Sequence, residues 1–199
     1  MSRLAAITAR IPRVLLFALA GVVQAGLIAA MVYDRAQILR EGVEVTLRTR
    51  PVDPRDFLRG DYVVLDYEIS RLRAGALKDT PTTGRGTYVY VKLTPNAEGF
   101  HEAVSVHAER VPVTGQEMLI RGRVTSGSTC GAGNWTFCEQ LFVKYGIEKF
   151  FVPEGEGREI EAARNKGRVS IVAAVTPEGR AAIKRLLLDG KPVYDEPTF

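Results

Sequence analysis

A long apolar stretch near the N-terminus constrains everything that follows it. It runs from Val14 to Val32 and reads VLLFALAGVVQAGLIAAMV, nineteen residues without a charged side chain. As a helix rising 1.5 Å per residue it would be about 28 Å long, close to the hydrocarbon thickness of a bilayer. The sequence therefore predicts one transmembrane helix over residues 14–32, preceded by a short N-terminus (1–13) and followed by a linker (33–42).

The charges beside this span predict its orientation. Arg3, Arg10 and Arg13 precede it, whereas Asp34 offsets Arg35 beyond it. The positive-inside rule then places residues 1–13 in the cytoplasm and residues 43–199 outside. Arginine outnumbers lysine by 20 to 7 and alanine is frequent. This composition indicates a GC-rich bacterial genome, so we expect an inner-membrane protein with a periplasmic domain.

A cleaved signal peptide is the alternative interpretation of the apolar stretch. The tripeptide Ala18-Leu19-Ala20 is similar to a cleavage site. Cutting there would leave a hydrophobic core of only a few residues, so an uncleaved signal anchor is favoured. Gly21, Ala25 and Ala29 form a stripe of small residues beside Gln24, a pattern that lets a second helix approach closely. Such residues are also common in spans that pack against nothing.

The basic net charge does not indicate nucleic-acid binding. The chain carries 27 basic and 23 acidic side chains, and residues 1–40 hold five of the arginines and one acid. From residue 41 onward 22 basic residues face 22 acidic ones. A neutral outer domain has no electrostatic footprint for phosphate backbones.

The cysteines favour a disulfide over a metal. Cys130 and Cys138 are the only two, and they flank a glycine-rich turn. A zinc site would want four ligands, whereas two cysteines outside the cytoplasm favour a bond between them. We expect a Cys130–Cys138 disulfide, no metal and no cofactor.

Alternating apolar residues predict a mainly β domain built from two similar halves. VVLDYEI (63–69) resembles FVKYGI (142–147), YVYVKLTPNAEG (88–99) resembles VSIVAAVTPEG (169–179), and VEVTLRTR (43–50) faintly resembles MLIRGRVT (118–125). Thr94–Gly99 and Thr176–Gly179 are typical of hairpin turns and should lead into returning strands. We expect an antiparallel barrel or sandwich with short helices, duplicated as residues 43–110 and 111–199, with the halves related by a pseudo-twofold axis.

The segment RGDYVVLDYEIS (59–70) carries the most specific motif. Residues 53–60 are typical of one helical turn, after which Asp61 begins a strand. The period of two points Tyr62 outward and Tyr67 inward, where its buried hydroxyl needs a hydrogen-bond partner. The segment contains Gly60-Asp61-Tyr62 followed by Leu65 and Tyr67, a pattern that resembles the one from which the GDYXXLXY family takes its name. A second segment, YGIEKFFVPEGEGREIE (145–161), resembles another characteristic segment of that family. The resemblance covers residues 41–199 and implies a small, membrane-anchored bacterial protein that accompanies polytopic membrane proteins. It brings no catalytic residues.

The densest acidic cluster lies within the second motif. Glu148 and Glu154 precede a segment, 156–166, that begins at Glu156 and is typical of a short helix. The carboxylates beside Gly155 and Gly157 suit a turn and helix cap, a contact with a partner or ligand, or acid and base catalysis. No nucleophile elbow, zinc-binding HExxH or phosphate loop accompanies them.

We therefore expect a non-enzymatic, membrane-anchored accessory protein. Its partner would be an inner-membrane or envelope protein, or a second copy, bound through the transmembrane helix and a periplasmic cleft. The candidate contact residues are Asp61, Tyr62, Tyr67, Glu148, Glu154 and Glu156. The alternative is an envelope hydrolase using two of these carboxylates about 10 Å or less apart.

Overall fold

The structure is a computed structural model that describes residues 12–51, 62–73, 84–128, 140–151 and 157–197. It divides into two units, Met1–Gln37 and Ile38–Phe199. The elements are helices α2 (Arg13–Glu41) and α3 (Gly157–Asn165), the 3-10 turn η1 (Glu68–Ser70), and strands β1 (Val43–Arg50), β2 (Tyr62–Val64), β3 (Asp66–Tyr67), β4 (Arg71–Arg73), β5 (Tyr88–Pro95), β6 (His101–His107), β7 (Met118–Ser128), β8 (Gln140–Lys144), β9 (Lys149–Phe151), β10 (Val169–Val175), β11 (Ala181–Leu188) and β12 (Lys191–Asp195).

Helix α2 is long and apolar enough to cross a membrane, judged by length and composition. The large apolar side chains of its N-terminal part are exposed, with Val14, Phe17 and Met31 each more than 70% exposed. The helix does not end with the apolar run but continues to Glu41, so the linker expected over residues 33–42 is helical up to its last residue. Nothing in residues 33–41 breaks a helix, because the segment lacks both glycine and proline.

The end of α2 that belongs to the second unit packs onto a sheet. Ile38 and Leu39 are buried with Ala174 of β10 and Ala182 of β11. At Gly42 a Cβ atom would lie 2.6 Å from the carbonyl oxygen of Ile38 and 2.9 Å from backbone of Ala174. Only a glycine lets the chain leave the helix this close to β10.

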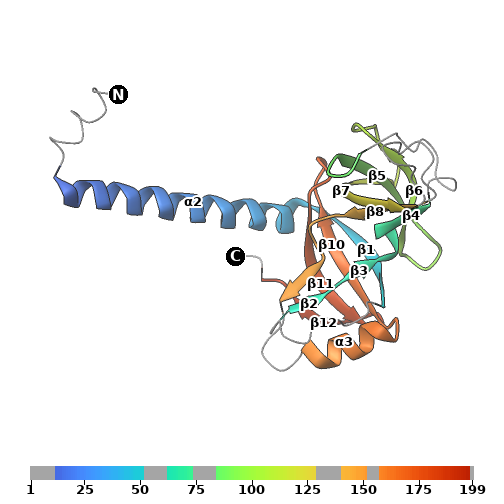
Figure 1. The fold of residues 1–199 in the computed structure, drawn as a ribbon. Helices are drawn as coiled ribbons and strands as arrows, with labels where there is room; N and C mark the ends of the chain where they lie inside the picture. The colour runs from blue at the N-terminus through green and yellow to red at the C-terminus, as the bar shows by residue number, and fades with distance from the viewer. Residues whose placement is uncertain (1–11, 52–61, 74–83, 129–139, 152–156, 198–199) are drawn as a thin grey trace. The chain divides into compact units, whose positions relative to one another are not determined.

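The second unit is mainly β, with antiparallel sheets only, as predicted (Figure 1). One five-stranded sheet has the order β12-β11-β10-β1-β3 and the other has the order β4-β8-β7-β5-β6, while β2 and β9 form a separate pair. In Figure 1, β10 lies beside β1 although the two are far apart in sequence. Tyr67 is buried, as predicted, and Val63, Leu65 and Ile69 are buried as well, all four at 4% exposure or less.

The strand expected over residues 63–69 is divided by changes of pairing partner. β2 pairs with β9, β3 pairs with β1, and β4 pairs with β8. Between β2 and β3 the N–H of Leu65 donates to the carbonyl of Glu148, 2.8 Å away. The side chains keep their alternation because the backbone stays extended to Tyr67, after which η1 turns the chain.

Two turns have the geometry that their sequences predict. In the first, Asn96 N–H donates to the carbonyl of Phe100 at 2.8 Å, and Gly99 has φ of 83°. In the second, Thr176 N–H donates to the carbonyl of Arg180 at 2.9 Å, and Gly179 has φ of 82°. Both turns therefore use a glycine where the backbone needs a left-handed residue.

The same irregularities recur in both hairpins. The β5–β6 register skips one residue at Val104, and the β10–β11 register skips one at Lys184, 80 residues later. Each hairpin therefore contains one β-bulge in its second strand. The short strand pairs show a similar spacing. Leu72 lies opposite Leu141, and Val63 lies opposite Phe150. Leu141 comes 78 residues after Val63, and Phe150 comes 78 residues after Leu72.

Candidate functional site

The two motif segments meet at the centre of the β unit. Tyr62, at the start of β2, lies opposite Phe151 in β9, so the strand that begins the first motif pairs with a strand of the second. Asp61, Glu154 and Glu156 lie outside the described residues, as do Cys130, Cys138 and the helical turn expected over 53–60. The candidates that the structure places are therefore Tyr67 and Glu148, together with the backbone of Tyr62.

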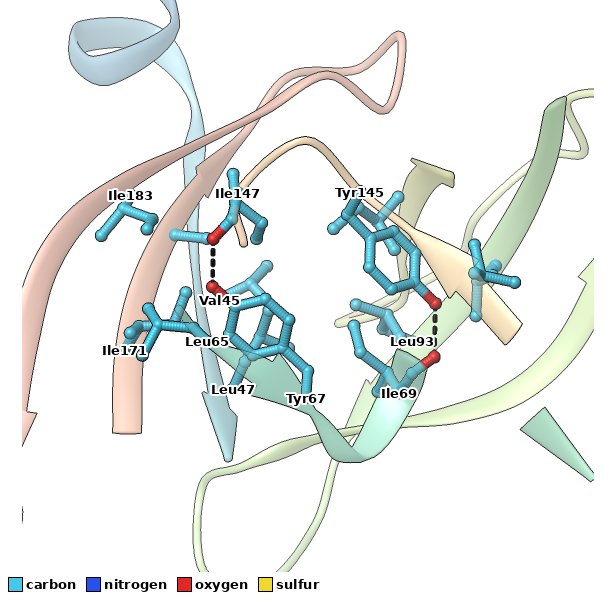
Figure 2. Close-up of a cluster of buried hydrophobic side chains, with 14 of the residues drawn as sticks. Val45, Leu47, Leu65, Tyr67, Ile69, Leu93, Tyr145, Ile147, Ile171 and Ile183 are labelled. Carbon is cyan, nitrogen blue, oxygen red and sulfur yellow. Dashed lines mark hydrogen bonds between the residues drawn. The ribbon is translucent and has the colours of Figure 1, made fainter. Parts of the chain in front are cut away.

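Two buried tyrosines bind across the junction of these segments. The hydroxyl of Tyr67 donates to the carbonyl of Ile147, and the hydroxyl of Tyr145 donates to the carbonyl of Ile69, 2.5 Å away. Figure 2 shows the two bonds as dashed lines, one from each segment to the other, among apolar side chains such as Leu65 and Leu93. The predicted need of Tyr67 for a partner is thus met by backbone, and the bond is reciprocated by a tyrosine that sequence analysis missed.

Burial keeps both hydroxyls protonated. Loss of water raises the pKa of Tyr67 well above its ordinary value, and the nearby carboxylates of Glu148 and Asp66 raise it further. Burial, followed by Glu148, likewise raises the pKa of Tyr145. Each oxygen therefore serves as a fixed hydrogen-bond donor, a structural role, and neither is poised to act as a base.

Glu148 is engaged in holding its own turn. One carboxylate oxygen accepts the N–H of Tyr145 at 2.5 Å, and the other accepts the N–H of Gly146 at 3.1 Å. Gly146 has φ of 83°, which a residue with a side chain rarely adopts. Glu148 thus fixes the turn that presents the carbonyl of Ile147 to Tyr67. A carboxylate with both oxygens occupied by backbone amides is poorly suited to the catalytic role in the hydrolase alternative.

A buried arginine also reaches this junction. Arg164 of α3 is 1% exposed, and its guanidinium donates to the carbonyl of Val64, in β2, and to the side-chain oxygen of Asn165. Burial lowers the pKa of Arg164, while the carboxylate of Glu161 opposes that shift. α3 lies within the segment expected to be helical, 156–166. Ala163 is buried and Ile160 packs against the core, as their apolar character suggests, whereas the sequence gave no sign that Arg164 would be buried beside them.

The junction holds no metal-like constellation in the part of the chain that is described. No three His, Cys, Asp or Glu side chains there are grouped so as to hold a metal ion.

The stripe of small residues on α2 is exposed along its length; its members are Gly21, Gln24, Ala25 and Ala29. A Cβ added at Gly21 would meet no other atom within 4 Å, so that face is open to a second helix.

Among the comparisons with known proteins, only the one with protein families found a match. Searches of curated proteins and of solved structures found no match. The family model for the GDYXXLXY protein matches residues 24–186, which include both motif segments and most of the β unit. The chain belongs to the GDYXXLXY family.

Proposed function

We propose that this protein is a single-pass inner-membrane anchor whose periplasmic β domain binds another membrane or envelope protein as a non-enzymatic accessory subunit. The observation that carries the proposal is the apolar part of α2, residues 14–33, whose large side chains such as Val14, Phe17 and Met31 are exposed. Such a surface in water would be strongly unfavourable, since each Å² of exposed apolar surface costs roughly 25 cal/mol. Hydrocarbon, or another helix within it, removes that cost.

The flanking charges support the orientation. Arg3, Arg10 and Arg13 would remain in the cytoplasm and residues 43–199 would lie in the periplasm. Alkaline carbonate should leave the protein in the membrane pellet. Protease added to spheroplasts should digest the β unit, whereas the same protease added to sealed inside-out vesicles should leave it intact. Release by carbonate, or digestion in the inside-out vesicles, would refute the anchor or its orientation.

We infer that the β unit arose by duplication, with residues 43–110 and 111–199 as its halves. The matching bulges at Val104 and Lys184 support this history, as does the reciprocal bonding of Tyr67 and Tyr145. Duplication would bring the GDY segment and the YGIE segment to one pseudo-axis. A partner that contacts Asp61 and Glu154 would then touch both halves at once.

Binding is tested by mild-detergent purification followed by identification of what remains bound. Asp61→Ala and Glu154→Ala should each weaken recovery of the partner. Gly21→Leu should also weaken it by filling the open face of α2, whereas Gly26→Leu, the same change about 140° further around the helix, should not. If the protein extracts alone under every gentle condition, or if the two glycine variants behave alike, the accessory role through α2 is refuted.

A further inference from the structure

The outer edge of β11 is covered by a strand that has no counterpart in the first half. β12 pairs antiparallel with β11, and beyond it the N–H of Glu196 donates to the carbonyl of Lys184, the bulged residue, at 2.8 Å. The ring of Tyr194 packs edge-on against Phe150, with ring centroids 5.0 Å apart. The second half therefore completes its edge with an extended segment that carries one aromatic side chain.

The corresponding edge of the first half is β6. β6 ends its sheet, and within the described ranges no strand pairs with its outer side. Val104, the bulged residue of β6, corresponds to Lys184, and its side chain is 39% exposed. An edge with unpaired backbone groups is a template for an added strand.

A cavity lies where the aromatic side chain of such a strand would go. It has a volume of about 200 Å³, enough for one aromatic ring, and is lined by η1, β4 and the start of β6. Its apolar residues are Ile69, Leu72 and Ala103. Leu72 corresponds to Phe150, the residue that Tyr194 contacts in the other half. The cavity thus occupies the place that β12 fills on the opposite side of the unit.

The charges at the rim of this cavity balance. The lining includes two acidic residues, Glu68 and Glu102, and two basic residues, Arg71 and Arg73. Two of these groups are already paired: Arg71 with Asp66 at 2.9 Å, and Glu102 with Asn96 at 2.6 Å. His101 is also occupied, because its Nδ1 accepts the N–H of Thr46 at 3.2 Å. Recognition here would rest on backbone pairing and on the apolar floor rather than on net charge.

We propose that β6 and this cavity receive an extended segment of a partner protein. The segment adds to the sheet antiparallel to β6, its backbone N–H donates to the carbonyl of Val104, and its aromatic side chain enters the cavity. This is strand addition, in which the main chain supplies affinity and a pocket supplies specificity. The proposal uses neither Asp61 nor Glu154, so it goes beyond the accessory role proposed above and is tested separately.

The probe is a synthetic peptide of residues 189–197, DGKPVYDEP, labelled with a fluorophore and titrated with the full chain in detergent micelles. Fluorescence anisotropy should show saturable binding. Ala103→Phe, which fills the cavity, should weaken binding at least tenfold. Ala97→Phe, the same change at an exposed position in the β5–β6 turn, should leave it unchanged. Circular dichroism of both variants checks that the sheet is retained.

Changes in the peptide test the mode of binding without altering the protein. Tyr194→Ala in the peptide should weaken binding at least tenfold. N-methylation at Glu196, whose N–H faces the bulge in β12, should weaken it similarly. N-methylation at Asp195, whose N–H points to the opposite edge of an extended chain, should be tolerated.

Three results would overturn the proposal. The first is a failure of the anisotropy to saturate at peptide-binding concentrations of the chain up to about 1 mM, because weaker binding would not indicate a specific site. The second is binding that depends on Phe150 and not on Ala103, since the peptide would then be displacing β12 from β11. The third is a benzoylphenylalanine crosslinker at Val104 that joins two copies of the chain and not the peptide, which would make the edge a contact between copies.

Discussion

Replacing Tyr67 with phenylalanine isolates the hydrogen bond between the two motif segments. The substitution keeps the ring in the core and removes only the oxygen that donates to Ile147. The carbonyl left behind is buried, and an unsatisfied buried acceptor costs about 1–3 kcal/mol. Because phenylalanine no longer desolvates a hydroxyl, we expect a net loss of about 1–2 kcal/mol in the free energy of unfolding. At this size of domain that lowers Tm by about 2–8 °C.

The hydrogen bond from Tyr145 to Ile69 can be tested in the same way. Tyr145→Phe should cost a similar amount, because its hydroxyl and the carbonyl of Ile69 are equally buried. Tyr88 is 57% exposed, so Tyr88→Phe should change stability by less than about 0.5 kcal/mol and serves as the control. The assay is guanidinium unfolding of the full chain in detergent, followed by circular dichroism of the sheet. If either buried variant matches the control within about 0.5 kcal/mol, the bonds do not stabilise the junction.

The remaining predictions concern the same unit. Because burial raises the pKa of both tyrosines, the unfolded chain loses these protons first as pH rises past about 10. Stability should thus be level below that pH and fall by up to about 2.7 kcal/mol per pH unit above it, a slope that the double Tyr-to-Phe variant should lose in unfolding curves taken from pH 9 to 11. Gly179→Ala should cost clearly more than Gly99→Ala: both have positive φ, but only at Gly179 would the Cβ lie 2.9 Å from the backbone of β7, and Tm measurements compare them. Glu148→Ala, which leaves two amides unpaired, should cost about 1–3 kcal/mol, and Glu148→Gln should cost less because it keeps an acceptor; equal losses would argue against the capping role. Ser70→Ala should leave stability unchanged or raise it by up to about 1 kcal/mol, since its hydroxyl is buried without a partner among the described residues.

Alternation and turn chemistry were sufficient to predict most strands. The alternate apolar side chains that begin at Val63 and Val89 are buried, because a period of two puts alternate side chains on one side wherever the backbone is extended. On the face predicted to begin at Val43, Val45 and Leu47 are buried but Val43 itself is 52% exposed. What alternation does not encode is the pairing partner. The division of the segment 63–69 at Leu65 follows from a change of neighbours, from β9 to β1, that involves residues far away in sequence.

The missed features share this non-local cause. β12 is five residues long and contains a proline, so it carries little strand signal by itself, and it forms because β11 offers an edge and Phe150 a surface for Tyr194. Arg164 gave no sequence signal of burial, because its acceptor, the carbonyl of Val64, becomes available only when β2 ends beneath α3. In the site, the need of Tyr67 for a partner was predictable, whereas the identity of that partner was not.

The exchange of strands between the halves bears on how the protein reaches its folded state. β1 pairs with β10 of the second half, and β5 of the first half pairs with β7 of the second. A lone first half would leave β1 with only β3 for a neighbour and the hydroxyl of Tyr67 without its acceptor. Long-range pairing of this kind makes folding slow, because the chain entropy of closing the loop is lost before the contacts form. The first half therefore cannot complete its core until β10 has emerged, and in the proposed topology that means until most of the chain has crossed the membrane. In that topology the proposed N-terminal anchor would keep the unfinished chain at the membrane, where the proposed partner could bind an exposed strand edge such as β6.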